Sequence, residues 1–132
     1  EDNNSKEEEE KAKETGNKNG IGDQEESLIK NIKNFKNSAE LVYERKDYTS
    51  ATILYFKALF GIIDLIILRE KGFIPKDHSE RFRALEEHFS DFYEFLDKNF
   101  EIYQDSYRTS IEKEDCDRVK EYVERLITEQ NI

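Results

Sequence analysis

The segment Ala51–Leu68, ATILYFKALFGIIDLIIL, limits most strongly what this chain can fold into, because it is apolar on almost every side. A helix that is apolar all round is normally buried. Its two charged residues, Lys57 and Asp64, stand seven positions apart. At about 100° per residue they fall on one helical stripe, with Gly61 between them. This stripe is the first place to look for a functional surface.

The charge of the chain is concentrated at its N-terminal end. The net charge is -10 over 132 residues, which is enough chain for one domain with a hydrophobic core. Residues 1–26 carry four Lys and ten Asp or Glu and almost no apolar side chains. We therefore predict a disordered acidic tail over residues 1–26 and one domain over residues 27–132. A net acidic domain argues against non-specific binding of a long phosphate backbone but allows a small basic patch.

Several classes of protein are excluded by composition. Cys116 is the only cysteine, so an intramolecular disulfide is impossible and a reducing cytoplasm is the expected location. Lys57 and Asp64 interrupt the long apolar segment before it reaches about 18 uncharged residues, so we expect a soluble protein that does not enter a membrane. His78 and His88 are ten positions apart, which does not fit a metal site. No glycine-rich phosphate loop is present, and we expect no cofactor.

Apolar residues at helical spacing predict two long helices in the first half of the domain. The first should run over residues 27–45. The second is the buried apolar segment, which either Asp47 or Thr49 can cap at its start. It should end at Gly72, because glycine is the residue that most readily takes the left-handed conformation after a helix.

The sequence of the second half of the domain predicts one short helix and two long ones. Pro75 stops any continuation, and Asp77 and Glu80 form a capping-box pattern at the start of a short helix. A helix with an aromatic stripe begins near Ser90, and the last helix begins after Ile111. We expect the aromatic stripe to pack in the core.

These elements predict an all-α fold. Four long helices with short connections favour an antiparallel four-helix up-and-down bundle, with a short extra helix between the second and third long helices. The second long helix is apolar beyond the stripe that such a bundle buries. We therefore expect a homodimer in which another copy covers part of it.

Two groups of residues are candidates for chemistry. Lys57 and Asp64 could form a polar seam that binds a phosphate or steers a proton. The alternatives are a buried ion pair, or Lys57 reaching water while Asp64 meets an arginine of a neighbouring helix. His78 is either a residue that starts the short helix or a catalytic group.

The second group lies in the sequence YQDSYRTS. Here the Arg108 guanidinium stands near the phenols of Tyr103 and Tyr107, an arrangement that can hold a phosphate and stack on a base. The structural alternative is an arginine near a helix C-terminus, with both phenols hydrogen-bonded at the edge of the core.

Taken in order, YFKALFGIIDLIIL, KGFIPKDHSERFRALEEHF and FYEFLDKNFEIYQDSYR resemble a prokaryotic or archaeal HEPN domain over residues 38–127. HEPN domains are small helical domains found beside or fused to nucleotidyltransferases, and many are metal-independent ribonucleases that assemble their site across a dimer. Their signature is an arginine followed, after four to six residues, by a histidine. Arg108 matches the arginine, but Lys113, Glu114 and Asp115 stand where the histidine should be.

The resemblance leads to three hypotheses about the function. We favour a non-catalytic HEPN-like module that binds a nucleotide, RNA or a partner protein through Lys57, Asp64, Tyr107 and Arg108, with Tyr103 and His78 nearby. The resemblance also implies a nucleotidyltransferase partner of the toxin–antitoxin kind. One alternative is a divergent metal-independent ribonuclease that uses Arg108. The other is a purely structural dimeric helical domain.

Overall fold

The computed structural model describes residues 18–132, which contain five helices and no strand. In chain order the helices are α2 (Lys18–Glu44), α3 (Tyr48–Lys71), α4 (His78–His88), α5 (Ser90–Asp105) and α6 (Lys113–Glu129). The prediction of an all-helical chain is therefore confirmed for these residues. The short helix α4 lies between the second and third of the long ones, as the sequence predicted.

Helix α3 is the centre of the fold. It packs against α2, α5 and α6, and most of its residues between Ala51 and Leu68 are buried. Asp47 caps its start by accepting a hydrogen bond from the Ser50 backbone N–H, and Gly72 ends it with φ of 82°. Thr49, the other candidate cap, instead accepts a hydrogen bond from the Ile111 backbone N–H at 2.8 Å.

The apolar character of α3 raises the question of whether this helix could span a membrane. Of the helices within residues 18–132, α3 is the one long and apolar enough to cross a membrane. However, 78% of its most apolar window is buried inside this structure. A core helix of a soluble protein has the same length and composition, so this property is weak evidence for a membrane span.

Helix α2 begins earlier than the sequence predicted. It starts at Lys18, so residues 18–26 are helical although they were assigned to the disordered tail. The extension is held by tertiary contacts: the Arg69 side chain of α3 pairs with Glu25 at 3.3 Å and also donates to the Gln130 carbonyl at the end of α6. The remainder of the predicted tail, residues 1–17, lies outside the described residues.

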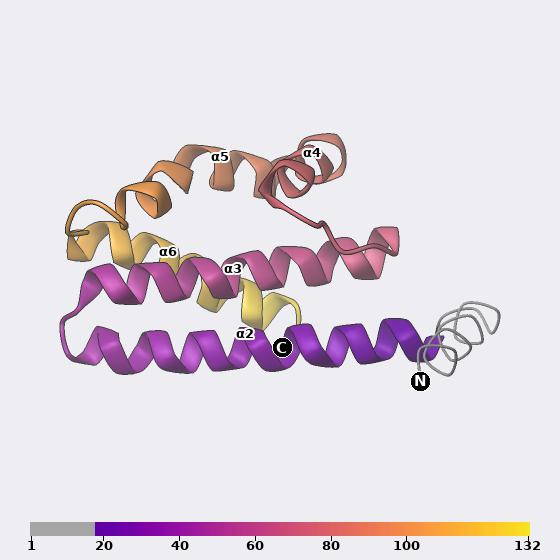
Figure 1. The fold of residues 1–132 in the computed structure, drawn as a ribbon, viewed down its shortest axis with the longest axis horizontal. Coiled ribbons are helices and arrows are strands. Elements are labelled where there is room, and N and C mark those ends of the chain that lie inside the picture. Colours follow the sequence, from indigo (N-terminus) through magenta and orange to yellow (C-terminus); the bar gives the residue numbers. More distant parts are fainter. Residues whose placement is uncertain (1–17) are drawn as a thin grey trace, which may run out of the picture.

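Figure 1 shows how the helices are arranged around α3. Helix α2 runs antiparallel to α3 along one side, α4 and α5 cover the opposite side, and α6 lies behind. Helix α6 is joined to α5 by the stacked rings of Phe95 and Tyr122, whose centroids are 3.6 Å apart. It is joined to α2 by the Tyr43 hydroxyl, which donates to the Asp117 carboxylate. No described helix crosses the side of α3 that faces the viewer.

Gly61 serves the packing of α2 on α3. A Cβ atom at this position would lie 2.8 Å from Cγ1 of Ile32, which is completely buried on α2. Gly61 therefore lets the two helix backbones approach closely. It lies on the stripe between Lys57 and Asp64, as predicted, but the space it leaves is filled by Ile32.

We predict that Gly61→Ala lowers the free energy of unfolding by about 1–2 kcal/mol, because overpacking outweighs the gain in helix propensity of about 1 kcal/mol. Urea unfolding measures the change. Gly22→Ala is the matched control: no atom lies within 4 Å of its Cβ position, so it should be neutral or stabilising. A stabilising Gly61→Ala would contradict the close approach.

Candidate functional site

A buried ion pair joins α3 to α4. The Arg81 guanidinium donates from Nε to Asp64 Oδ1 at 2.7 Å and from Nη2 to Oδ2 at 2.9 Å. The two residues are 8% and 7% exposed, and the guanidinium lies 5.0 Å from the Phe60 ring centroid. Asp64 thus meets an arginine of a neighbouring helix, one of the alternatives that the sequence left open. Because the two charges neutralise each other, the carboxylate is not available to a ligand.

His78 is bonded to the same guanidinium. Arg81 Nη1 lies 2.6 Å from His78 Nδ1. Burial of part of the ring, followed by the charge of Arg81, lowers the pKa of His78, while the Asp64 carboxylate acts in the opposite direction. The residue as a whole is still exposed. His78 is therefore a neutral imidazole, with one ring nitrogen bound inside the protein and an edge open to solvent.

Three aromatic rings from α3 and α5 surround the imidazole. The ring centroid of His78 is 4.7 Å from Phe60, 5.4 Å from Phe100 and 6.1 Å from Tyr103. The hydroxyl of Tyr103 is hydrogen-bonded to that of Tyr107 at 2.7 Å. Burial, with this hydrogen bond as the second cause, raises the pKa of Tyr103 to about 12. The Tyr103 phenol therefore stays protonated at neutral pH.

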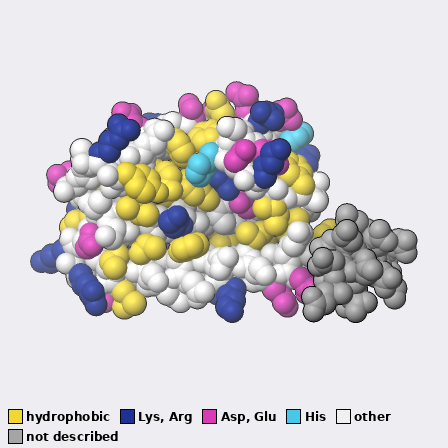
Figure 2. All heavy atoms as spheres, in the orientation of Figure 1, with side chains coloured by type: hydrophobic (Ala, Val, Ile, Leu, Met, Phe, Trp, Pro, Cys, Tyr) yellow, Lys and Arg dark blue, Asp and Glu magenta, His cyan; other side chains and the backbone are white. Residues whose placement is uncertain are grey.

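Lys57 supplies a positive charge to this face. It is half-buried on α3, and within residues 18–132 it makes no ion pair with a carboxylate. Its charge is close enough to His78 to contribute to the lowered pKa of that residue. Figure 2 shows the surroundings: hydrophobic side chains gather over α3 and α5 on this side, interrupted by Lys or Arg and by His.

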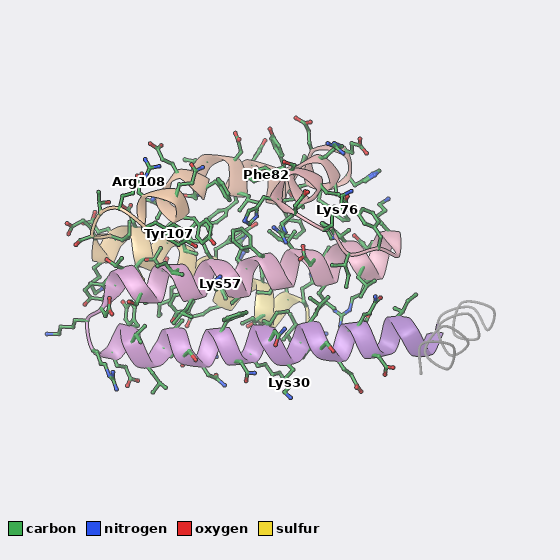
Figure 3. All side chains as sticks on the ribbon, in the orientation of Figure 1. Lys30, Lys57, Lys76, Phe82, Tyr107 and Arg108 are labelled. Atoms are coloured by element: carbon green, nitrogen blue, oxygen red, sulfur yellow. The ribbon has the colours of Figure 1, made fainter. Side chains whose placement is uncertain are left out.

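Arg108 stands apart from the cluster. It lies in the turn after α5, where its backbone N–H donates to the Asp105 carbonyl, and its side chain is exposed. Tyr107 also lies in this turn, after the end of α5, and is 62% exposed. Figure 3 shows Lys57 and Tyr107 on the face toward the viewer and Arg108 farther out. The structure thus brings Tyr107 to Tyr103, whose ring lies near His78. Arg108 makes no ion pair with any residue in the described part of the chain.

Arg81 is the central residue that the sequence reasoning missed. In the segment SERFRAL it looks like one of several solvated charges on a short helix. A signal was present, because Arg81 stands three residues after His78 and four before the buried Leu85. These spacings place all three on one face of α4, the face that packs on the core.

A separate groove of about 1080 Å³ lies between α5 and α6. Its lining includes Phe92, Phe95 and Tyr122 together with charged residues of both signs, such as Lys98 and Glu94. None of the candidate residues from the sequence contributes to it. Among residues 18–132 there is also no group of three or more His, Cys, Asp or Glu side chains placed to hold a metal ion.

Comparisons with protein-family models, with curated proteins and with solved structures found no match to this chain. The site itself consists of a neutralised ion pair, a neutral imidazole bonded to it, two hydrogen-bonded phenols and one lysine.

We predict that Asp64→Leu or Arg81→Met alone lowers the free energy of unfolding by about 3–5 kcal/mol, because each leaves one buried charge without its partner. The double variant Asp64→Leu/Arg81→Met should lose much less than the sum, since apolar side chains of similar size replace a buried pair well. Urea unfolding of the four proteins measures the coupling. Additive losses would show that the two side chains act independently.

Proposed function

We propose that this chain is a non-catalytic, HEPN-like helical module that binds the phosphate-bearing end of a nucleotide or RNA. The proposed fold is an antiparallel four-helix up-and-down bundle of α2, α3, α5 and α6, with α4 as the extra short helix. One observation carries the proposal. Lys57 is an unneutralised cation on the face that also holds His78 and the Tyr103–Tyr107 pair.

Each part of this face suits one part of such a ligand. The Lys57 ammonium can bind a phosphate oxygen through a charge-assisted hydrogen bond. The ring of Tyr107 is 62% exposed and can stack on a base. Because the rest of the domain is acidic, the attraction is local. This favours a nucleotide or an RNA end over a long stretch of RNA.

A missing histidine favours a non-catalytic module. The HEPN ribonuclease signature needs a histidine after Arg108, and Lys113, Glu114 and Asp115 occupy those positions. None of these three supplies the imidazole that the family uses for proton transfer. A divergent ribonuclease that relies on Arg108 is the competing proposal, and it predicts RNA cleavage in EDTA.

The proposed module acts in the cytoplasm, needs no cofactor and has protein partners. A second copy of the chain is the first partner we propose, because Leu41 of α2 is 64% exposed and hydrophobic side chains gather over α3 and α5 on the face in Figure 2. Sedimentation equilibrium tests this homodimer. A nucleotidyltransferase of the toxin–antitoxin kind is the second proposed partner, and it follows from the HEPN resemblance alone.

We predict that Lys57→Gln weakens binding of a fluorescein-labelled, 5′-phosphorylated RNA tetranucleotide by about tenfold, which corresponds to about 1.4 kcal/mol. Fluorescence anisotropy measures the affinity, and the slope of log affinity against log salt should fall by about one. Lys30→Gln is the matched control, since Lys30 is an exposed lysine of α2 at the opposite edge of the molecule in Figure 3.

The other outcomes separate the competing functions. Equal losses in the Lys57→Gln and Lys30→Gln variants would mean that binding is non-specific, and the proposed face would be wrong. Cleavage of the RNA in EDTA by the wild type, but not by an Arg108→Ala variant, would favour the ribonuclease. No binding and no cleavage would favour the purely structural dimer.

A further inference from the structure

The hydrogen bond between Arg81 and His78 determines where the imidazole carries its proton. An arginine side chain has five N–H donors and no acceptor. His78 Nδ1, at 2.6 Å from Arg81 Nη1, must therefore accept, so it carries no hydrogen. A neutral imidazole that accepts at Nδ1 carries its hydrogen on Nε2. His78 then offers an N–H donor on the side of the ring away from Arg81.

Arg81 is itself held in place by other contacts, which keep its guanidinium bonded to His78. Two of its nitrogens are bonded to the two oxygens of Asp64, and the pair is more than nine-tenths buried. The face of Phe60 lies against the guanidinium, and Phe60 also contacts the imidazole. Asp64 thus orients Arg81, and Arg81 orients His78.

We propose that Arg81 is a positioning residue that fixes His78 as a neutral Nε2–H donor, and that this donor and Lys57 together bind a terminal phosphate. The phosphate part rests on the proposed function, because it names the part of the ligand that the face recognises. An N–H donor and a cation on the same face suit a group with several anionic oxygens. Inorganic phosphate and the 5′-phosphate of RNA share this chemistry.

This assignment gives His78 a binding role and removes it from proton transfer. Its Nδ1 is occupied by Arg81, and its Nε2 already carries a hydrogen, so neither nitrogen can accept a proton from a ribose hydroxyl. A second proton on Nδ1 would point at the guanidinium of Arg81. His78 is thus a poor replacement for the missing HEPN histidine.

The first test is the tautomer of His78, read from the ¹⁵N signals of both ring nitrogens in histidine-labelled protein at pH 7.5. We expect a single Nε2–H tautomer for His78. His88, the only other histidine, serves as the reference ring in the same spectrum. In an Arg81→Lys variant, which keeps the charge but loses the planar fork, His78 should move to a mixture of tautomers. A hydrogen on Nδ1 of wild-type His78 would overturn the positioning role.

The second test titrates inorganic phosphate and then two RNA tetranucleotides that differ only in a 5′-phosphate. The His78 Nε2–H signal should shift with phosphate and with the phosphorylated RNA. His78→Phe should weaken binding of the phosphorylated RNA about tenfold, whereas His78→Gln, which keeps an N–H donor, should restore part of it.

The outcomes distinguish this inference from the proposed function. If both RNAs bind equally and the signal does not move, the phosphate subsite is refuted while RNA binding stands. If neither RNA binds but inorganic phosphate shifts the signal, the subsite stands and the RNA ligand is refuted. If no phosphate species moves the signal, the subsite is refuted outright.

Discussion

The buried ion pair between Asp64 and Arg81 is the interaction on which the candidate site depends. Moving two charges out of water carries a desolvation penalty of several kcal/mol per ion, and their attraction does little more than offset it. The pair is therefore hard to explain as a source of stability. Its geometric effect is clearer, because it ties the short helix α4 to the centre of α3 at one defined position. From that position Arg81 reaches His78, and the imidazole meets the aromatic rings of α3 and α5.

The sequence predicted those parts of the fold that local chemistry determines. Asp47 and Gly72 bound α3, and Asp77 starts α4, because capping residues act on the backbone next to them. The start of α2 was predicted too late, since residues 18–26 have little apolar surface of their own. Their helix is held from a distance by Arg69, which lies on another helix. Such a contact has no local pattern in the sequence.

For the candidate site too, the sequence predicted individual residues but not their tertiary contacts. Asp64 was recognised from its spacing to Lys57, and Tyr103 and Tyr107 from their place near Arg108. Nothing in the sequence said that Asp64 and Tyr103 would both lie close to His78. Arg81 joins two of them, and its partner lies seventeen positions away in the chain on a different helix. Arg108, chosen for its place near two phenols and matched to the HEPN motif, lies in an exposed turn instead. Periodicity identified the residues, whereas their grouping depends on how α4 folds back over α3.

If the ion pair exists to build the binding face, removing it without unfolding the protein should weaken recognition of phosphate as much as losing His78 does. The direct measurement is the affinity of the Asp64→Leu/Arg81→Met variant for the 5′-phosphorylated RNA, with its helicity checked by circular dichroism. We expect a folded protein that retains Lys57 and Tyr107 yet binds the phosphorylated RNA about tenfold more weakly than the wild type, as His78→Phe does. Wild-type affinity in that variant would contradict the account, because the face would then form without the ion pair.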